Sequence, residues 1–88
     1  MIIRSQDKEV IANLNNIDSI CIEHNVCEFD VVCYNGLRDS SLKISAYSTE
    51  EKAIKVLDMI CKAYENYRGG NVYEHSIFNM PSDEEVEV

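Results

Sequence analysis

The residues in this chain that most readily bind a metal or act as nucleophiles lie between positions 21 and 33. They are, in order, Cys21, His24, Cys27 and Cys33. Thiolate and imidazole groups suit zinc, so this set defines a zinc-binding hypothesis. Structural zinc sites usually take two ligand pairs from separate elements, whereas these residues surround one predicted hairpin. We therefore expect no metal and no other cofactor, and keep zinc as an alternative.

Cys27 and His24 also raise the possibility of a cysteine nucleophile beside a base. A reactive thiol needs a cationic neighbour or a helix N-terminus to lower its pKa, and the sequence places neither there. A chain of 88 residues also leaves little room for both a core and an elaborate catalytic cleft. We interpret this stretch as a polar hairpin tip and expect a protein that is not an enzyme.

Carboxylates dominate the charge of the chain. Sixteen acidic residues face eight basic ones, giving a net charge of −8. Such a surface repels phosphates, which argues against direct nucleic-acid binding and favours a protein partner with a basic surface. The acidic candidates for that contact are Asp18, Glu23, Glu28, Asp30, Asp83, Glu84 and Glu85. An ordinary solvated surface is the competing interpretation.

One long amphipathic helix is the clearest structural element. Its apolar stripe consists of Ala53, Val56, Leu57, Ile60, Cys61, Tyr64 and Tyr67, which predicts a helix over residues 49–67. Ser48 and Glu51 match the S-x-x-E capping box, so we expect Ser48 to cap the first turn. Because Cys61 lies on the stripe, we expect it to be buried. The glycine pair at 69–70 ends the helix.

The rest of the chain favours short strands. We expect a hairpin between residues 2–3 and 10–14, and further strands over 18–23, 29–34 and 42–47. Residues 71–78 fit a last strand, with a helix as the alternative.

Alternation of apolar and polar residues predicts which side chains face the core. In the strand 29–34, Val31 and Cys33 face inward and Asp30 faces outward. In the strand 42–47, the inward residues are Leu42, Ile44 and Ala46, and the outward residues are Lys43, Ser45 and Tyr47.

These elements predict an α+β fold in which an antiparallel sheet of four to six strands carries the helix on one face. We expect a single domain over residues 1–80 and an acidic tail over 81–88 that is solvated and disordered. No apolar run approaches the roughly 20 residues that cross a bilayer. Without a secretory signal, we interpret the protein as cytoplasmic, with its cysteines reduced.

Several stretches together resemble a known family. The opening MIIRSQDK at 1–8, the segment NIDSI at 16–20, the central YSTEEKA at 47–53 and the ending FNMP at 78–81 are similar to short uncharacterised proteins encoded by phages and integrative elements of Gram-positive bacteria. The similarity covers nearly the whole chain. It implies a genomic setting but no catalytic residues, and the segment from Cys21 to Cys33 is not a feature of that family.

Charge, size and resemblance lead to one functional hypothesis. We expect a non-enzymatic accessory protein of a phage or mobile element that binds a host or element-encoded protein, as an acidic inhibitor of a nucleic-acid-handling or defence system. The alternatives are a small-molecule or zinc-binding module, and a structural component that forms a homodimer through an unpaired sheet edge.

Overall fold

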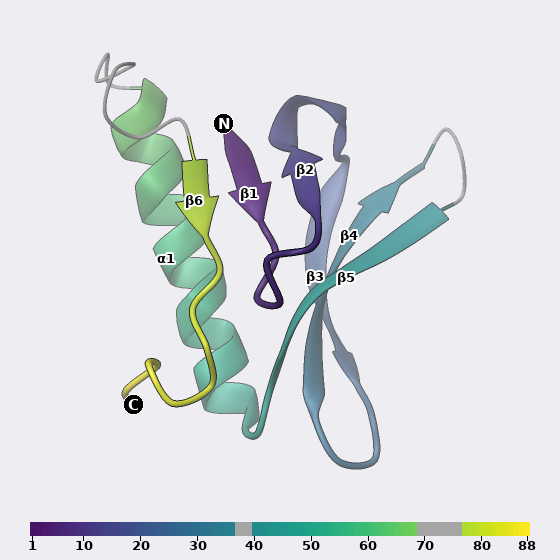
Figure 1. The fold of residues 1–88 in the computed structure, drawn as a ribbon, viewed down its shortest axis with the longest axis vertical. Coiled ribbons are helices and arrows are strands. Elements are labelled where there is room, and N and C mark those ends of the chain that lie inside the picture. Colours follow the sequence, from purple (N-terminus) through teal and green to yellow (C-terminus); the bar gives the residue numbers. More distant parts are fainter. Residues whose placement is uncertain (37–39, 69–76) are drawn as a thin grey trace.

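The protein has an α+β fold, and its described residues form one α-helix and two three-stranded sheets (Figure 1). The computed structural model describes residues 1–36, 40–68 and 77–88. The elements are β1 (Ile2–Arg4), β2 (Ile11–Asn13), a short 3-10 helix (Leu14–Asn16), β3 (Ser19–His24), β4 (Phe29–Asn35), β5 (Ser40–Tyr47), α1 (Glu50–Arg68) and β6 (Ile77–Asn79). The predicted α+β class is confirmed. Most of the expected last strand, residues 71–76, lies outside the described residues.

The prediction of one antiparallel sheet is wrong. The strand orders are β2-β1-β6 and β3-β4-β5, and β6 runs parallel to β1. Parallel neighbours need a long crossover, which here includes the second sheet and α1. Residues far apart in sequence thus share the first sheet, and short-range alternation carries no signal of that pairing.

α1 supplies the face on which both sheets share a core. Ala53, Val56 and Ile60 are buried and join a cluster that includes Ile3 of β1 and Val31 of β4. The helix prediction is confirmed to within one residue at each end. Cys61, however, is exposed. It lies about 100° around the helix from Ile60, which carries it off the buried stripe.

The cap of α1 differs by one residue from the prediction. The backbone N–H of Lys52 donates to Thr49 Oγ1 at 3.2 Å, so Thr49 is the cap. Ser48 instead donates its backbone N–H to Asp83 Oδ1 at 2.7 Å, and its hydroxyl also contacts that carboxylate. The distant Asp83 carboxylate therefore binds Ser48, the residue that the local motif predicts as the helix cap.

A bulge in β5 changes which of its side chains are buried. Val31 pairs with Ser45, while the next residue, Val32, pairs with Lys43, so Ile44 is an extra residue in β5. The insertion places Ser45 and Tyr47 on the core side, where they are 3% and 1% exposed. Their predicted outward orientation is wrong because the extra residue reverses the alternation.

The other alternation predictions in β4 and β5 have mixed outcomes. Ile44, Val31 and Cys33 are buried as expected. Leu42 pairs with Cys33 but lies near the end of the sheet and is 39% exposed. Asp30, expected to face solvent, is buried, and its partner Ala46 is only half-buried.

Gln6, in the turn between β1 and β2, joins the two sheets. Its backbone N–H donates to the Ile44 carbonyl at 2.8 Å. Its side-chain amide accepts from the Ala46 N–H and donates to the Ala46 carbonyl, both at 3.1 Å. The same amide donates to the Pro81 carbonyl at 3.1 Å. One residue therefore holds the β1–β2 turn, the edge of β5 and the C-terminal segment together.

The C-terminal residues 81–88 pack against the domain, contrary to the expectation of a disordered tail. Val86 is 4% exposed and belongs to the core. The Tyr47 hydroxyl donates to the Pro81 carbonyl at 2.8 Å, and Lys52 Nζ donates to the Asp83 carbonyl at 2.9 Å. One apolar side chain and several long-range hydrogen bonds thus offset the solvation of the acids.

Replacing Gln6 with alanine should destabilise the fold. The change leaves the Ala46 N–H and carbonyl without their Gln6 partner and removes one of the two donors to the Pro81 carbonyl. This loss costs about 2 kcal/mol and lowers the melting temperature by about 10 °C. Thermal unfolding followed by circular dichroism measures this. Asn15→Ala is the control, because Asn15 is exposed and its side-chain amide donates no hydrogen bond within the described residues. Equal melting temperatures for Gln6→Ala and the control would contradict the role of this junction.

Candidate functional site

Three segments far apart in sequence bring carboxylates to one end of the molecule. These are the β3–β4 hairpin, the start of α1 and the C-terminal segment, which lie together at the lower end of Figure 1. We call this surface the acidic end and define its acids as Glu23, Glu28, Asp30, Glu50, Glu51, Asp83, Glu84, Glu85 and Glu87. Against these nine acids stand Lys43, Lys52 and Lys55, a difference of −6 out of the chain's net −8.

Direct contacts hold the three segments together. His24 Nε2 lies 3.1 Å from Glu50 Oε2 and links the hairpin to the start of α1. His24 also packs edge-on against Phe29, with ring centroids 5.2 Å apart. On the other side of the helix start, Ser48 and Lys52 bind the Asp83 carboxylate, and Lys55 donates to the Glu87 carbonyl. The acidic end is therefore a product of tertiary contacts.

Lys43 partly neutralises the hairpin acids. Its ammonium lies 2.9 Å from Glu28 Oε1 and 3.5 Å from Asp30 Oδ1. The hydrogen bond from Lys43 is the main reason that the pKa of Glu28 falls below its usual value. Asp30 is buried, and its other oxygen accepts from the Asn25 amide. Asp30 thus anchors the hairpin and is inaccessible to a partner.

The C-terminal acids include both hydrogen-bonded carboxylates and carboxylates that are free of such bonds within the described residues. Asp83 and Glu85 accept backbone N–H bonds from Ser48 and Ser82, and these bonds are the first cause of the lowered pKa of each carboxyl. Glu84 is exposed, and its carboxylate makes no contact in the described part of the chain. Asp83 and Glu85 shape the segment, while Glu84 presents its charge to solvent.

Glu23 and Asp18 lie on β3 and just before it, but in different settings. Glu23 accepts a hydrogen bond from the Tyr34 hydroxyl, and this bond is the main reason that the pKa of Tyr34 rises to about 12. Asp18 lies away from the acidic end and accepts the Gly36 N–H at 2.6 Å. A Cβ on Gly36 would stand 2.7 Å from Asp18 Oδ2, so a larger residue there would displace this carboxylate. Asp18 supports the chain reversal after β4.

The structure therefore groups six of the seven acids proposed from sequence and leaves Asp18 apart. It adds Glu50, Glu51 and Glu87, which sequence reasoning missed. Glu50 and Glu51 lie at the N-terminus of α1, where the helix dipole favours negative charge. The sequence therefore already offered a local structural reason for these two acids. The contacts of Ser48, Lys52 and Lys55 with the C-terminal segment bring them beside the C-terminal acids.

The zinc-binding set is spread over β3, β4 and the hairpin tip. Cys21 is half-buried, Cys27 is exposed and Cys33 is buried. Within residues 1–36, 40–68 and 77–88, no three His, Cys, Asp or Glu side chains are grouped to hold a metal ion. Burial, with a smaller effect from Cys21, raises the pKa of Cys33 to about 11. That thiol stays protonated at neutral pH.

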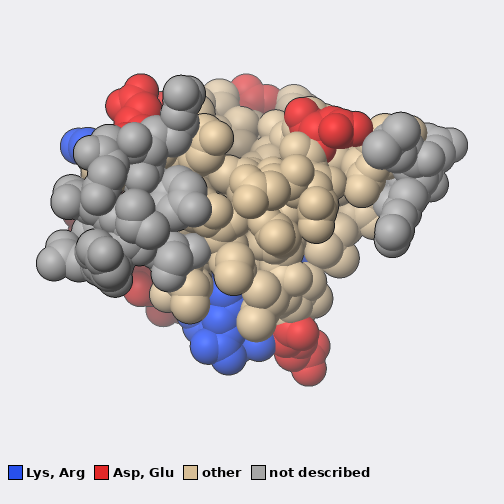
Figure 2. All heavy atoms as spheres, turned by 90° about the horizontal axis from the view of Figure 1, so that it is seen from above, with Lys and Arg blue, Asp and Glu red and all other residues tan. Residues whose placement is uncertain are grey.

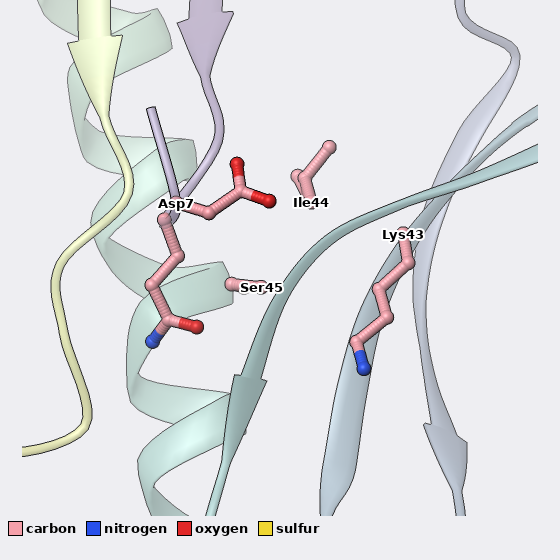
Figure 3. Close-up of a pocket in the computed structure, with 5 residues that line it drawn as sticks. Asp7, Lys43, Ile44 and Ser45 are labelled. Carbon is pink, nitrogen blue, oxygen red and sulfur yellow. The ribbon is translucent and has the colours of Figure 1, made fainter. Parts of the chain in front are cut away.

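A small pocket lies between the β1–β2 turn and β5 (Figure 3). Figure 3 shows Asp7 extending from the turn toward Ile44 of β5, with Lys43 farther along that strand. The pocket volume is about 310 Å³, which is near the lower limit of ligand sites of roughly 300 Å³. Gln6 and Ser45 complete its lining. We assign this pocket no ligand.

The end of the molecule opposite the acidic end has a different surface. Figure 2 looks onto it and shows mainly uncharged residues at its centre, with both acidic and basic residues near the rim. Among the described helices, none is both long and apolar enough to cross a membrane. Comparison of the chain with protein-family models, with curated proteins and with solved structures finds no match.

The four thiols should differ in reactivity. At pH 8, exposed Cys27 and Cys61 should react rapidly with a colorimetric disulfide reagent and Cys21 more slowly, whereas Cys33 should react only after unfolding. Mass spectrometry of partly labelled protein assigns each site. Labelling in denaturant is the control, in which all four thiols react. Rapid labelling of Cys33 in the native protein would contradict its burial.

The Asp83 carboxylate should make the stability of the fold depend on pH. Its folded pKa is lowered from 3.8, so the carboxylate stabilises the fold above that value, and this stabilisation disappears as the pH falls through the folded pKa. Asp83→Asn should therefore melt at a lower temperature than the wild type at pH 7, and the difference should shrink below pH 3.8. Melting curves from pH 2 to 7 test this. Glu84→Gln, the control, should leave the pH 7 melting temperature unchanged; a pH-independent loss in Asp83→Asn would exclude the linkage.

Proposed function

We propose that this protein is a non-enzymatic accessory protein that binds the basic surface of a protein partner through its acidic end. The observation that carries the proposal is the convergence of three acidic segments onto one end, which holds −6 of the chain's net −8. A surface with one sign of charge accelerates association with an oppositely charged protein and repels nucleic acid. The partner would be a protein whose own ligand is an anion.

The exposed acids of this end are the proposed contact residues. Glu51, Glu84 and Glu87 are exposed, and their carboxylates make no contact within the described residues. They can meet a partner's lysines or arginines without losing an internal bond. Asp30, Asp83 and Glu85 would act indirectly by holding the hairpin and the C-terminal segment in place.

The resemblance of the opening, centre and ending to phage and integrative-element proteins supports a setting for this activity. In that setting the partner would be a host or element-encoded protein that handles nucleic acid, including defence systems. Its phosphate-binding groove is basic and therefore complementary to the acidic end. Occupying the groove would inhibit the partner by competition, with no catalytic step. We propose the cytoplasm as the location.

The proposal predicts that exposed acids of this end control affinity. Affinity capture from a host lysate with the tagged full chain first identifies the partner, and titration then gives its dissociation constant. The triple change Glu51→Gln, Glu84→Gln, Glu87→Gln removes three unpaired charges, each worth about 0.5 kcal/mol, so affinity should fall about tenfold. Wild-type binding should weaken as salt rises from 50 to 500 mM, because salt screens the attraction.

The matched control removes three exposed acids outside the acidic end. Glu9→Gln, Asp58→Asn, Glu65→Gln changes the net charge by the same amount. This control should lower the affinity by less than about twofold. Equal losses in the two triple variants would mean that net charge alone matters. Salt-independent capture, or a partner that binds nucleic acid and this protein simultaneously, would overturn the proposed competition.

A further inference from the structure

Within the described residues, three of the four sheet edges are short or covered, and one is neither. Edge strands β2 and β6 have three residues each. Part of the β5 edge is occupied by Gln6, and β5 also carries a bulge. Edge strand β3 spans six residues in regular register with β4, and it contains no proline, lysine or glycine. Soluble proteins normally protect such edges, because open strands pair with other chains.

The hydrogen-bond pattern identifies the open backbone groups of β3. The Asn25 N–H donates to the Glu28 carbonyl at 2.9 Å, which marks these two residues as a hydrogen-bonded pair. In an antiparallel ladder such pairs alternate, so Glu23 and Cys21 also bond to β4. Ile20 and Ile22 direct their N–H and carbonyl groups away from β4. No described residue outside β3 bonds to these groups.

We propose that β3 pairs antiparallel with β3 of a second copy of this chain, giving a two-fold dimer with a continuous six-stranded sheet. The core-facing residues of β3 must stay on one face of that sheet, which restricts the register. One allowed register places Ile20 opposite the partner's Ile22. This pair occurs twice, once on each side of the two-fold axis. The same register also places Cys21 opposite the partner's Cys21 at the axis, in a pair without hydrogen bonds.

The sequence of β3 favours this register over its two neighbours. It pairs isoleucine with isoleucine and places Glu23 opposite the partner's Ser19. The two neighbouring registers each keep a single isoleucine pair, at the axis. One places Ile20 opposite the partner's His24 and the other places Ile22 opposite the partner's Asp18, so each sets an apolar residue against a polar one. Cross-strand apolar pairs stabilise antiparallel sheets, so the first register is preferred. The Cα atoms of the two Cys21 residues would then lie about 4.5 Å apart, within disulfide range.

The dimer is independent of the proposed function, and salt separates the two. Each copy carries a net charge of −8, so the copies repel and salt should strengthen dimerisation. Binding of a basic partner should instead weaken with salt. Sedimentation velocity of the full chain from 5 to 500 µM, at 50 and 500 mM salt, should detect a monomer–dimer equilibrium. A monomer throughout, or a dimer weakened by salt, overturns the proposal.

Two changes test the edge itself. Cys21→Lys places two ammonium groups together at the axis and should raise the dimer dissociation constant at least about tenfold. Cys21→Ser, the matched control, should change it by less than about threefold. A synthetic full chain with an N-methyl group on Ile22 keeps every side chain but loses an outward N–H, and should be monomeric. Circular dichroism checks that each variant folds; if every folded variant dimerises like the wild type, the interface is elsewhere.

Oxidation tests the register. In a Cys27→Ser, Cys61→Ser background, Cys21 is the thiol available at the edge, because Cys33 is buried. Diamide accepts the two hydrogens and electrons of two Cys21 thiols, joining them in one disulfide. A covalent dimer should appear on non-reducing gels and disappear when Cys21→Ser is added. If this protein sediments as a dimer but forms no cross-link, the proposed register is wrong.

Discussion

The side-chain amide of Gln6 makes hydrogen bonds that a neighbouring strand would otherwise make, at the place where the two sheets meet. It offers one acceptor and two donors, and all three are used, by both backbone groups of Ala46 and by the Pro81 carbonyl. The backbone of Gln6 adds a bond to Ile44, the bulge residue. A continuous ladder cannot cross a bulge without a break, so a side chain that can both donate and accept is well suited to this junction. The position of the C-terminal segment depends on the same residue.

That position has consequences for the surface. Once Pro81 is held, Asp83 lies where it can bind Ser48 and Lys52 at the start of α1. The hairpin tip reaches the same helix start through His24 and Glu50. Three acidic segments that would repel one another in an extended chain are thus held side by side by a small number of specific bonds. A surface assembled at this electrostatic cost is a better candidate for recognition than an equal number of scattered charges.

The two proposed interfaces use different parts of the molecule. The acidic end uses exposed carboxylates and favours a basic protein, whereas the β3 edge uses backbone groups and favours a second copy. The hairpin connects them, because β3 ends at His24, which contacts Glu50 of the acidic end. A two-fold dimer would carry two acidic ends, which would allow bivalent binding to a partner that offers two basic sites.

Local sequence determined the elements whose causes are local. The helix over residues 50–68 and the β1–β2 hairpin follow from apolar spacing and turn residues, and the α+β class follows from both. The net charge and most of the acidic candidates were also evident. These features depend on neighbours within a few positions, which a single sequence displays directly.

Only the tertiary structure decided the features that depend on distant partners. The bulge at Ile44 places Tyr47 on the core side. Ser48, the expected helix cap, instead binds Asp83. The parallel β1–β6 pairing divided the expected sheet, and the packing of Val86 ordered the C-terminal segment beside the helix start. Each of these contacts joins residues tens of positions apart or adds one residue to a ladder. Neither kind of event leaves a periodic signal in the chain, because periodicity records only the local path of the backbone.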